Sequence, residues 1–219
     1  MSINKALSAF ISIFGAIVLV GWVLGIEIVK RGINGWELMM PATAALFFFV
    51  GMFLYCEQKE GTCPRLFREN VLIAIAGLTC VTLWWQGIVI SSKVLGHDEF
   101  SQKATDLLPY LPSLATSGNF FIIFVHSLFI SMIKSKWPRR AVAAILFATS
   151  ISILIGYTIG MPVLYFKYNI FNAMAFHSAI LFILCGIVIF RGQEDIKPKK
   201  KMSFNNTPKI RLNFSKNKS

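Results

Sequence analysis

The amino-acid sequence predicts an all-α integral membrane protein with six transmembrane helices, arranged as three hairpin repeats with both termini in the cytoplasm. Three observations lead to this prediction. The composition is 55% apolar, with a mean hydropathy of +0.63. Six apolar runs each approach the roughly 20 residues that cross about 30 Å of hydrocarbon. Lysine and arginine are also distributed unevenly between alternate loops, as in multi-pass membrane proteins.

The six predicted helices share a lack of Asp, Glu, Lys and Arg away from their ends. They lie near residues 6–26, 38–56, 70–90, 110–132, 140–160 and 172–191. The first run follows Lys5, as a signal peptide would, but it is long and no small-residue cleavage site follows it, so we expect a retained helix. Residues 1–191 are therefore the predicted membrane domain, and residues 192–219 a basic cytoplasmic tail that we expect to be disordered.

The orientation follows from the positive charges. The N-terminus, the 57–69 loop, the 133–140 loop and the tail together carry 17 Lys and Arg, whereas the alternate loops carry 5. Loops rich in Lys and Arg stay in the cytoplasm, so both termini are predicted there. Lys30 and Arg31 are the local exception.

Four cysteines, at positions 56, 63, 80 and 185, show no C-x-x-C spacing. Under the predicted orientation Cys56 and Cys63 face the reducing side of the membrane. The sequence therefore predicts packing cysteines rather than a structural disulfide or a quinone-linked disulfide enzyme.

An internal pattern predicts the hairpin repeat. The odd-numbered helices share an ending of an aromatic residue, two further residues and a glycine, at 22–25, 84–87 and 157–160. The even-numbered helices share a beginning of a hydroxyl residue and a small residue, at 43–44, 116–117 and 178–179. Three copies of one helix hairpin would produce this recurrence, and chance repetition of short motifs is the alternative.

Three segments also carry a resemblance to a known family: 21–26, 39–52 and 174–186. They resemble the N-terminal multi-helix (MASE-like) membrane sensor modules of bacterial sensor histidine kinases and diguanylate cyclases. In those modules hairpins recur with a Pro-x-Thr-Ala type of helix start, and the last helix opens with Met-x-x-His-Thr-Ala. The resemblance covers residues 15–191 and includes no output domain.

The resemblance implies a module in the bacterial inner membrane that binds a small or membrane-soluble signal. It would act through a separate signalling protein or a homo-oligomer. A small channel or transporter of three hairpin repeats, and a structural subunit of a membrane complex, are the alternatives. We expect no enzyme, cofactor or metal site, because the sequence shows no catalytic set of residues, and the absence of a mid-membrane charge disfavours a proton-coupled pump.

Polar residues gather toward the predicted outer ends of the helices and suggest a ligand pocket. The candidates are His177, Ser178, Asn119, Thr116 and Gln86, with Trp85 and Tyr157 as walls. Hydrogen bonding between helices is the competing interpretation. His177 stands at the recurrent histidine position of the resembled family. His126 is expected roughly 16 Å deeper than His177, too far to share a metal ion.

Counted from Arg191, the tail carries nine Lys and Arg and two acidic residues. Its densest part contains Lys197, Lys199, Lys200 and Lys201. Basic segments beside a membrane span bind anionic lipids, at about 1 kcal/mol for each charge near the surface. The lipid bilayer is thus the expected partner of the tail, and nucleic acid is not, because no recognition motif accompanies the charges.

Overall fold

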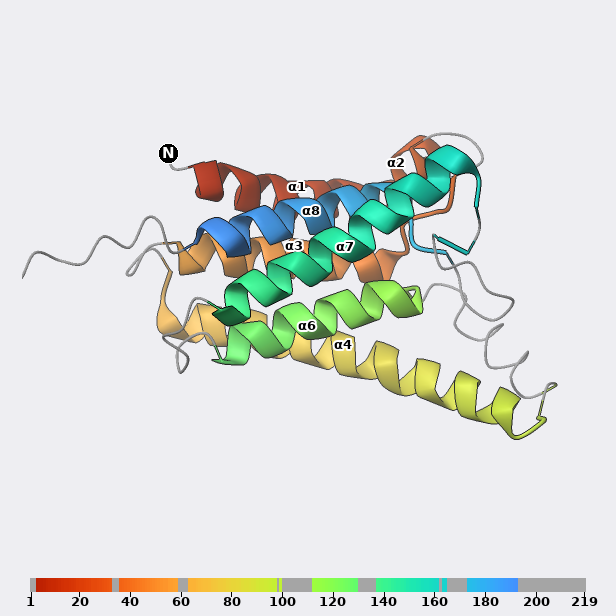
Figure 1. Ribbon diagram of the computed structural model, residues 1–219. Helices are drawn as coiled ribbons and strands as arrows, with labels where there is room; N and C mark the ends of the chain where they lie inside the picture. The colour runs from red at the N-terminus through yellow and green to blue at the C-terminus, as the bar shows by residue number, and fades with distance from the viewer. Residues whose placement is uncertain are drawn as a thin grey trace, which may run out of the picture.

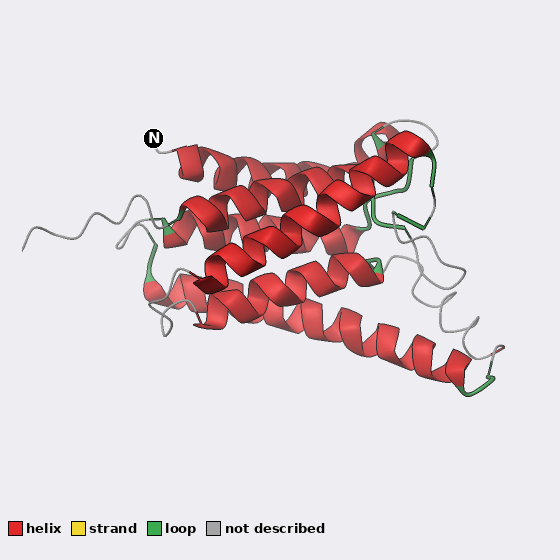
Figure 2. Cartoon of the chain, viewed as in Figure 1, coloured by secondary structure: helices red, strands yellow, loops and turns green. Residues whose placement is uncertain are grey.

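The structure, a computed structural model, describes residues 3–32, 36–58, 63–97, 99, 112–129, 137–161, 163–164 and 173–192. Within these ranges the regular structure is entirely helical, and the long helices run side by side in one bundle (Figures 1 and 2). The all-α prediction is confirmed for this part of the chain.

Six long helices and one short helix make up the described part of the chain. They are α1 (Ile3–Val23), α2 (Glu27–Arg31), α3 (Pro41–Glu57), α4 (Arg65–Val94), α6 (Leu114–Phe129), α7 (Trp137–Ile159) and α8 (Phe176–Arg191). Each long helix overlaps one of the predicted apolar runs. α3 begins with Pro41, whose missing N–H costs nothing in a first turn.

The long helices have the character of a membrane protein. α1, α4 and α7 are each long and apolar enough to cross a membrane, whereas α3, α6 and α8 are apolar but shorter. Large apolar side chains also point outward, among them Phe10 on α1, Val81 on α4 and Ile145 on α7. A lipid environment tolerates such an exposed apolar surface, whereas large apolar patches are rare on soluble monomers.

The helices pack in a cyclic order. Each of α1, α4 and α7 contacts the next long helix in the chain and one further long helix. The contacts are those of α1 with α3 and α8, of α4 with α6 and α3, and of α7 with α8 and α6. The shorter helices α3, α6 and α8 thereby lie inside the bundle, and α1, α4 and α7 lie outside.

The bundle has two ends, which we name by what they carry. At the tail end α1, α4 and α7 begin and α3, α6 and α8 end, so residues 193–219 follow from here (Figure 1). At the loop end the helices of each consecutive pair are connected, and α2 lies there beside the end of α7 (Figure 1). The loop-end part of α4 diverges from the other helices (Figure 1).

Three phenylalanines meet where the inner helices converge. Phe47 of α3, Phe120 of α6 and Phe182 of α8 are each 0% exposed. Their ring centroids are 4.7 Å apart for Phe47 and Phe182, and 4.8 Å apart for each of the other two pairs. Tilted and edge-on rings at such distances are favourable arrangements of aromatic side chains. The three rings therefore fill the axis of the bundle at this level.

The buried positions of the outer helices recur at constant spacing. In α1 they are Asn4, Ser8, Ile11, Gly15, Val18 and Gly21. Each recurs in α4 at a spacing of 71 residues (75 − 4), as Ile75, Thr79, Thr82, Gln86, Val89 and Ser92. From Ser8 onward each also recurs in α7 at a spacing of 135 residues (143 − 8), as Ala143, Leu146, Ser150, Ile153 and Gly156.

The inner helices show the same behaviour. The first five buried positions of α3 are Thr43, Ala44, Leu46, Phe47 and Val50. They recur in α6 at a spacing of 73 residues (116 − 43), as Thr116, Ser117, Asn119, Phe120 and Ile123. They recur in α8 at a spacing of 135 residues (178 − 43), as Ser178, Ala179, Leu181, Phe182 and Cys185.

The three outer helices end in the same turn. Gly25, Gly96 and Gly160 have φ values of 72°, 76° and 74°, in the left-handed region that glycine adopts without steric cost. In each case the N–H of the following residue donates to the carbonyl oxygen five residues earlier, at 2.8 Å, 2.8 Å and 2.9 Å. This is the usual glycine-terminated helix end.

The helix end predicted at Trp84–Gly87 is wrong. α4 continues past Gly87 to Val94, and Gly96 provides the turn. A glycine inside a helix costs only about 1 kcal/mol relative to alanine, so Gly87 does not stop a helix whose next turn packs Val89 and Ser92 inside the protein.

The prediction that all four cysteines are packing residues is also wrong. Cys56, in the last turn of α3, and Cys63, just before α4, form a disulfide. The two cysteines are seven positions apart in the sequence, and their Cα atoms are 5.4 Å apart. That separation is typical of disulfides. Cys185 remains a buried free thiol, and Cys80 an exposed one.

Candidate functional site

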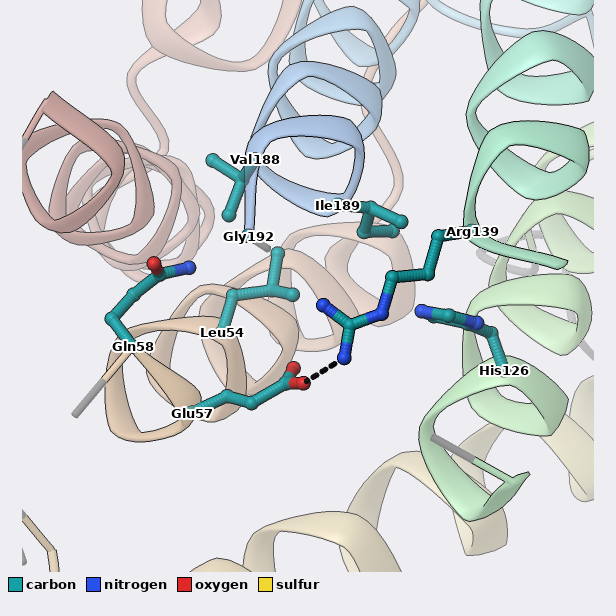
Figure 3. A pocket seen from close by; sticks show the side chains of 8 residues that line it. All are labelled: Leu54, Glu57, Gln58, His126, Arg139, Val188, Ile189 and Gly192. Atoms are coloured by element: carbon teal, nitrogen blue, oxygen red, sulfur yellow. Dashed lines mark ion pairs between the residues drawn. The ribbon is translucent and has the colours of Figure 1, made fainter. Parts of the chain in front are cut away.

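A small polar pocket lies at the tail end of the bundle, between helices that are far apart in sequence (Figure 3). It is lined by Leu54, Glu57 and Gln58 from the end of α3, His126 from α6, Arg139 from α7, and Val188, Ile189 and Gly192 from the end of α8. All three consecutive helix pairs thus contribute to this pocket. We call it the tail-end pocket.

An ion pair forms one side of the tail-end pocket. The guanidinium Nη2 of Arg139 lies 3.8 Å from Oε1 of Glu57, and their side chains are only 14% and 23% exposed (Figure 3). Two charges withdrawn from water in this way need each other, because an unpaired buried charge is strongly unfavourable. The pair therefore connects the end of α3 to the start of α7.

Gly192 allows the end of α8 to lie against the same arginine. A Cβ atom at this position would be 3.4 Å from Nη1 of Arg139 and 3.3 Å from the carbonyl oxygen of Val188. A larger side chain would push the guanidinium away from this position. The residue at which the tail begins is thus in close contact with the ion pair.

His126 completes the tail-end pocket from α6. It is buried, and its Nε2 atom has no hydrogen-bond partner within the described part of the chain. The pocket has a cavity volume of about 20 Å³, which is room for one water molecule. A single water bonded to Nε2 would satisfy this buried nitrogen, as buried polar groups normally require.

At the loop end, several of the polar residues predicted from the sequence form hydrogen bonds between α4 and α6. Gln86 donates from Nε2 to the carbonyl oxygen of Pro112 at 2.7 Å and to Oγ of Ser117 at 3.1 Å. The hydroxyl groups of Ser113 and Thr116 are 2.7 Å apart. Gln86 therefore joins α4 to the first turn of α6, as the interpretation of inter-helix hydrogen bonding predicts.

Asn119 connects α6 to α7. Its Nδ2 atom donates to Oγ1 of Thr149 at 3.1 Å. Ser178, by contrast, is buried in the first turn of α8. Asn119 and Gln86 thus have partners on neighbouring helices, and their amide groups act as bridges between helices.

Tyr157 belongs to a second group of residues at the loop end. Its hydroxyl donates to the carbonyl oxygen of Met174 at 2.9 Å, and the indole Nε1 of Trp22 donates in the same way to the carbonyl oxygen of Met39 at 2.8 Å. Both bonds join residues 17 positions apart in the sequence. Each one fastens the end of an outer helix to the segment that leads into the following inner helix.

Trp36 covers this second group. Its ring centroid is 4.1 Å from that of Phe176 and 6.0 Å from that of Tyr157. His177 follows in the first turn of α8, half-buried, with its ring centroid 6.1 Å from that of Phe14 on α1. The predicted ligand residues with such contacts thus fall into two groups. One lies among α4, α6 and α7 and contains Gln86, Thr116 and Asn119. The other lies among α1, α7 and α8 and contains Tyr157 and His177.

Two nitrogens of the predicted pocket lack partners. Nε2 of His177 and Nε1 of Trp85 are buried without a hydrogen bond in the described ranges. His126, at the tail end, lies at the opposite end of the bundle from His177, as predicted from their depths.

Lys30, one of the two cations that oppose the predicted orientation, has partners within and beside α2. The ammonium group of Lys30 lies 2.9 Å from Oε1 of Glu27 and 4.6 Å from the ring centroid of Trp22. This hydrogen bond and the accompanying charge lower the pKa of the Glu27 carboxyl group. Lys30 is therefore buried between an ion-pair partner and an aromatic ring.

The tail-end pocket was missed in the sequence because its charges lie at helix ends. Glu57 and Arg139 each stand at the boundary of an apolar run, where a charge ordinarily faces water or headgroups. Only the packing of α3 against the other pairs brings them together. The tail lysines Lys197, Lys199, Lys200 and Lys201 lie outside the described residues, as does most of the loop 98–111.

Comparisons of the chain with protein-family models, with curated proteins and with solved structures find no match. The resemblance to bacterial sensor modules therefore stays a prediction drawn from the sequence. A function for this chain is therefore inferred from the packing, charge and burial of the described residues.

Proposed function

We propose that the chain crosses the membrane six times as three repeated helix hairpins, α1–α3, α4–α6 and α7–α8. The constant spacing of buried positions supports this, because equivalent residues then face equivalent neighbours. The shared glycine turns and the cyclic packing support it too. Repeated hairpins of this kind are common in membrane proteins and arise from duplication of one unit.

Both termini lie in the cytoplasm under this proposal, and the membrane is a bacterial inner membrane. The tail end carries Lys5, Arg65, Arg68, Arg139 and Arg140, which favour the cytoplasmic side. Lys30 and Arg31 at the loop end are outnumbered by these tail-end cations. The six apolar helices need no further partner to cross the bilayer, since a helix satisfies its own backbone.

The function that the geometry supports best is signal transduction: the bundle binds a small or membrane-soluble signal and acts through a partner protein that contacts its tail. The single observation that carries this is the tail-end pocket. Glu57, His126 and Arg139 come from three different hairpins and meet beside Gly192, where the tail begins. A change in the packing of any hairpin would therefore alter the environment of the tail.

The filled axis favours this function over a channel. Phe47, Phe120 and Phe182 are fully buried and in mutual ring contact at the centre of the inner helices. A conducting path along the axis would have to separate these rings.

A photo-crosslinking experiment tests the partner. The full chain is expressed in its native host with Lys199→p-benzoylphenylalanine, and adducts formed in intact membranes are identified by mass spectrometry. The expected adduct is one protein with an output domain, such as a kinase or a cyclase. The matched control carries the same probe at Phe10, which faces outward from α1 and should give lipid adducts.

A second arm tests the tail-end pocket itself. Arg139→Gln removes the charge that pairs with Glu57 and should reduce the yield of the tail adduct several-fold. Arg140→Gln removes the charge of an exposed neighbour and should leave the yield unchanged. If the tail gives only lipid or self adducts, or if both variants behave alike, the proposed signalling role is wrong.

A further inference from the structure

An apolar groove lies on the outside of the first hairpin, near the tail end. α1 contributes Ala9, Ser12 and Ile13 to its lining, and the last two turns of α3 and the first turn of α4 contribute aromatic rings, Tyr55 and Phe67. Its volume is about 440 Å³, within the range of about 300 to 1,000 Å³ that holds small organic ligands. Since Ile13 and Phe67 are exposed, a molecule could reach the groove from the lipid side.

The disulfide forms part of the same groove. Cys56 and Cys63 both line it, so the S–S bond borders on the apolar space. Here a disulfide and an apolar groove of ligand size lie side by side.

The compartment makes this disulfide informative. Under the proposed orientation Cys56 and Cys63 lie at the cytoplasmic surface, where thiols are kept reduced and a disulfide is usually catalytic or redox-sensing. Formation of the S–S bond there requires an oxidant that cytoplasmic reductants do not neutralise first. A lipophilic oxidant dissolved in the bilayer reaches the groove without passing through the cytoplasm.

We propose that Cys56 and Cys63 are a redox site that a membrane-soluble quinone oxidises from the groove. In this step the two thiols give up two electrons and two protons, and the S–S bond forms between their sulfur atoms. The quinone accepts both electrons and both protons on its two carbonyl oxygens and leaves as the quinol. The inference rests on the proposed sensory function and names the chemical class of its signal, the redox state of the quinone pool.

The position of the pair connects this chemistry to the tail-end pocket. Glu57, which pairs with Arg139, directly follows Cys56 in the sequence. Closing the disulfide ties the end of α3 to the start of α4 and therefore fixes the carboxylate that holds α7. Reduction releases that tie and leaves the ion pair on a freer helix end.

The test uses the full chain in liposomes of neutral and anionic lipid. The protein is reduced, freed of reductant without air, and mixed with decylubiquinone, while quinol is followed by its absorbance and free thiols by maleimide-polyethylene-glycol gel shift. The expected result is one quinol formed and two thiols lost per chain. Cys63→Ser should form no quinol, whereas Cys80→Ser, a change at an exposed cysteine that is not part of the groove lining, should behave as the unaltered chain.

Ala9→Trp tests the groove separately from the thiols. A large ring at this position fills part of the groove and should slow quinol formation at least tenfold. The water-soluble oxidant diamide should still close the disulfide in this variant, which shows that the protein is folded and the thiols competent. If diamide oxidises the pair and decylubiquinone does not, or if Ala9→Trp reacts at the original rate, the quinone site is disproved. The tail adduct of the crosslinking experiment would be unaffected by that outcome, so the two proposals fail separately.

Discussion

At the scale of single residues, the three phenylalanines on the axis matter most. Their burial and mutual contact mean that each one supports the other two. In lipid, where burying apolar surface contributes little to helix association, close packing of this kind is the main stabilising contribution. A cavity at this level would weaken contacts in all three hairpins.

Phe120→Ala should destabilise the protein by about 3 to 5 kcal/mol, the usual cost of a large cavity in a packed core. Phe121→Ala removes the same side chain from the neighbouring position, which is 43% exposed, and should cost little. Unfolding of the purified protein in mixed detergent micelles, followed by circular dichroism, measures both. Equal losses in the two variants would mean that the axis is not filled as described.

The hydrogen bond from Tyr157 to the carbonyl oxygen of Met174 should contribute about 1 kcal/mol. Tyr157→Phe keeps the ring next to Trp36 and removes only the donor. The same micelle unfolding experiment should show this loss, while Thr158→Val, which removes an exposed hydroxyl bonded within its own helix, should show less than half of it. A Tyr157→Phe protein as stable as the original would contradict the role assigned to this bond.

At the scale of helices, α1 and α3 approach closely because small residues face each other. A Cβ atom on Gly51 would collide with the backbone of Ser12, and one on Gly15 would lie 2.6 Å from the carbonyl oxygen of Ala44. In α4 the position that corresponds to Gly15 is Gln86, whose side chain donates a hydrogen bond to Ser117 of α6. The contact between α1 and α3 thus depends on glycines, whereas the contact between α4 and α6 includes a hydrogen bond at the corresponding position.

Gly51→Ala should separate α1 from α3 and lower stability by roughly 2 kcal/mol, as overpacking does. Gly87→Ala is the matched control, because a Cβ atom there meets nothing within 4 Å. Since alanine is the better helix former, the control should be neutral or gain up to about 1 kcal/mol. A loss of stability in Gly87→Ala as large as that in Gly51→Ala would refute the close approach.

The sequence predicted the positions of the helices well, because apolar runs bounded by charged loops leave few alternatives. It also predicted the turns at Gly25 and Gly160. The turn at Gly96 was missed, since Lys93 stands there at the position that Trp22 and Tyr157 hold in the other outer helices. A motif search follows residue types, whereas the fold repeats burial and backbone conformation.

The candidate site was less accessible to prediction. Polar residues such as Gln86 and Asn119 were recognised, but which helices they join depends on the cyclic packing. The pairing of Glu57 with Arg139 and the disulfide of Cys56 with Cys63 arise from three-dimensional neighbours at helix ends. Neither follows from composition or periodicity.

The six long helices form one bundle, with α3, α6 and α8 inside and α1, α4 and α7 outside. Each outer helix contacts the inner helix that follows it and one further inner helix, and the three phenylalanines are fully buried. Together with the buried rings on the axis, this packing supports the proposed signalling module over the alternative of a channel.

Distances between spin labels test this arrangement most directly. Phe10, Val81 and Ile145 are equivalent, outward-facing positions of α1, α4 and α7, related by the spacings of 71 and 135 residues. Each pair is labelled in turn in lipid nanodiscs, in a background without other reactive cysteines, and measured by pulsed electron paramagnetic resonance. Three hairpins around one axis predict three distances that agree within the reach of the label side chain. One distance close to the sum of the other two would show a row of hairpins instead, and would contradict the proposed bundle.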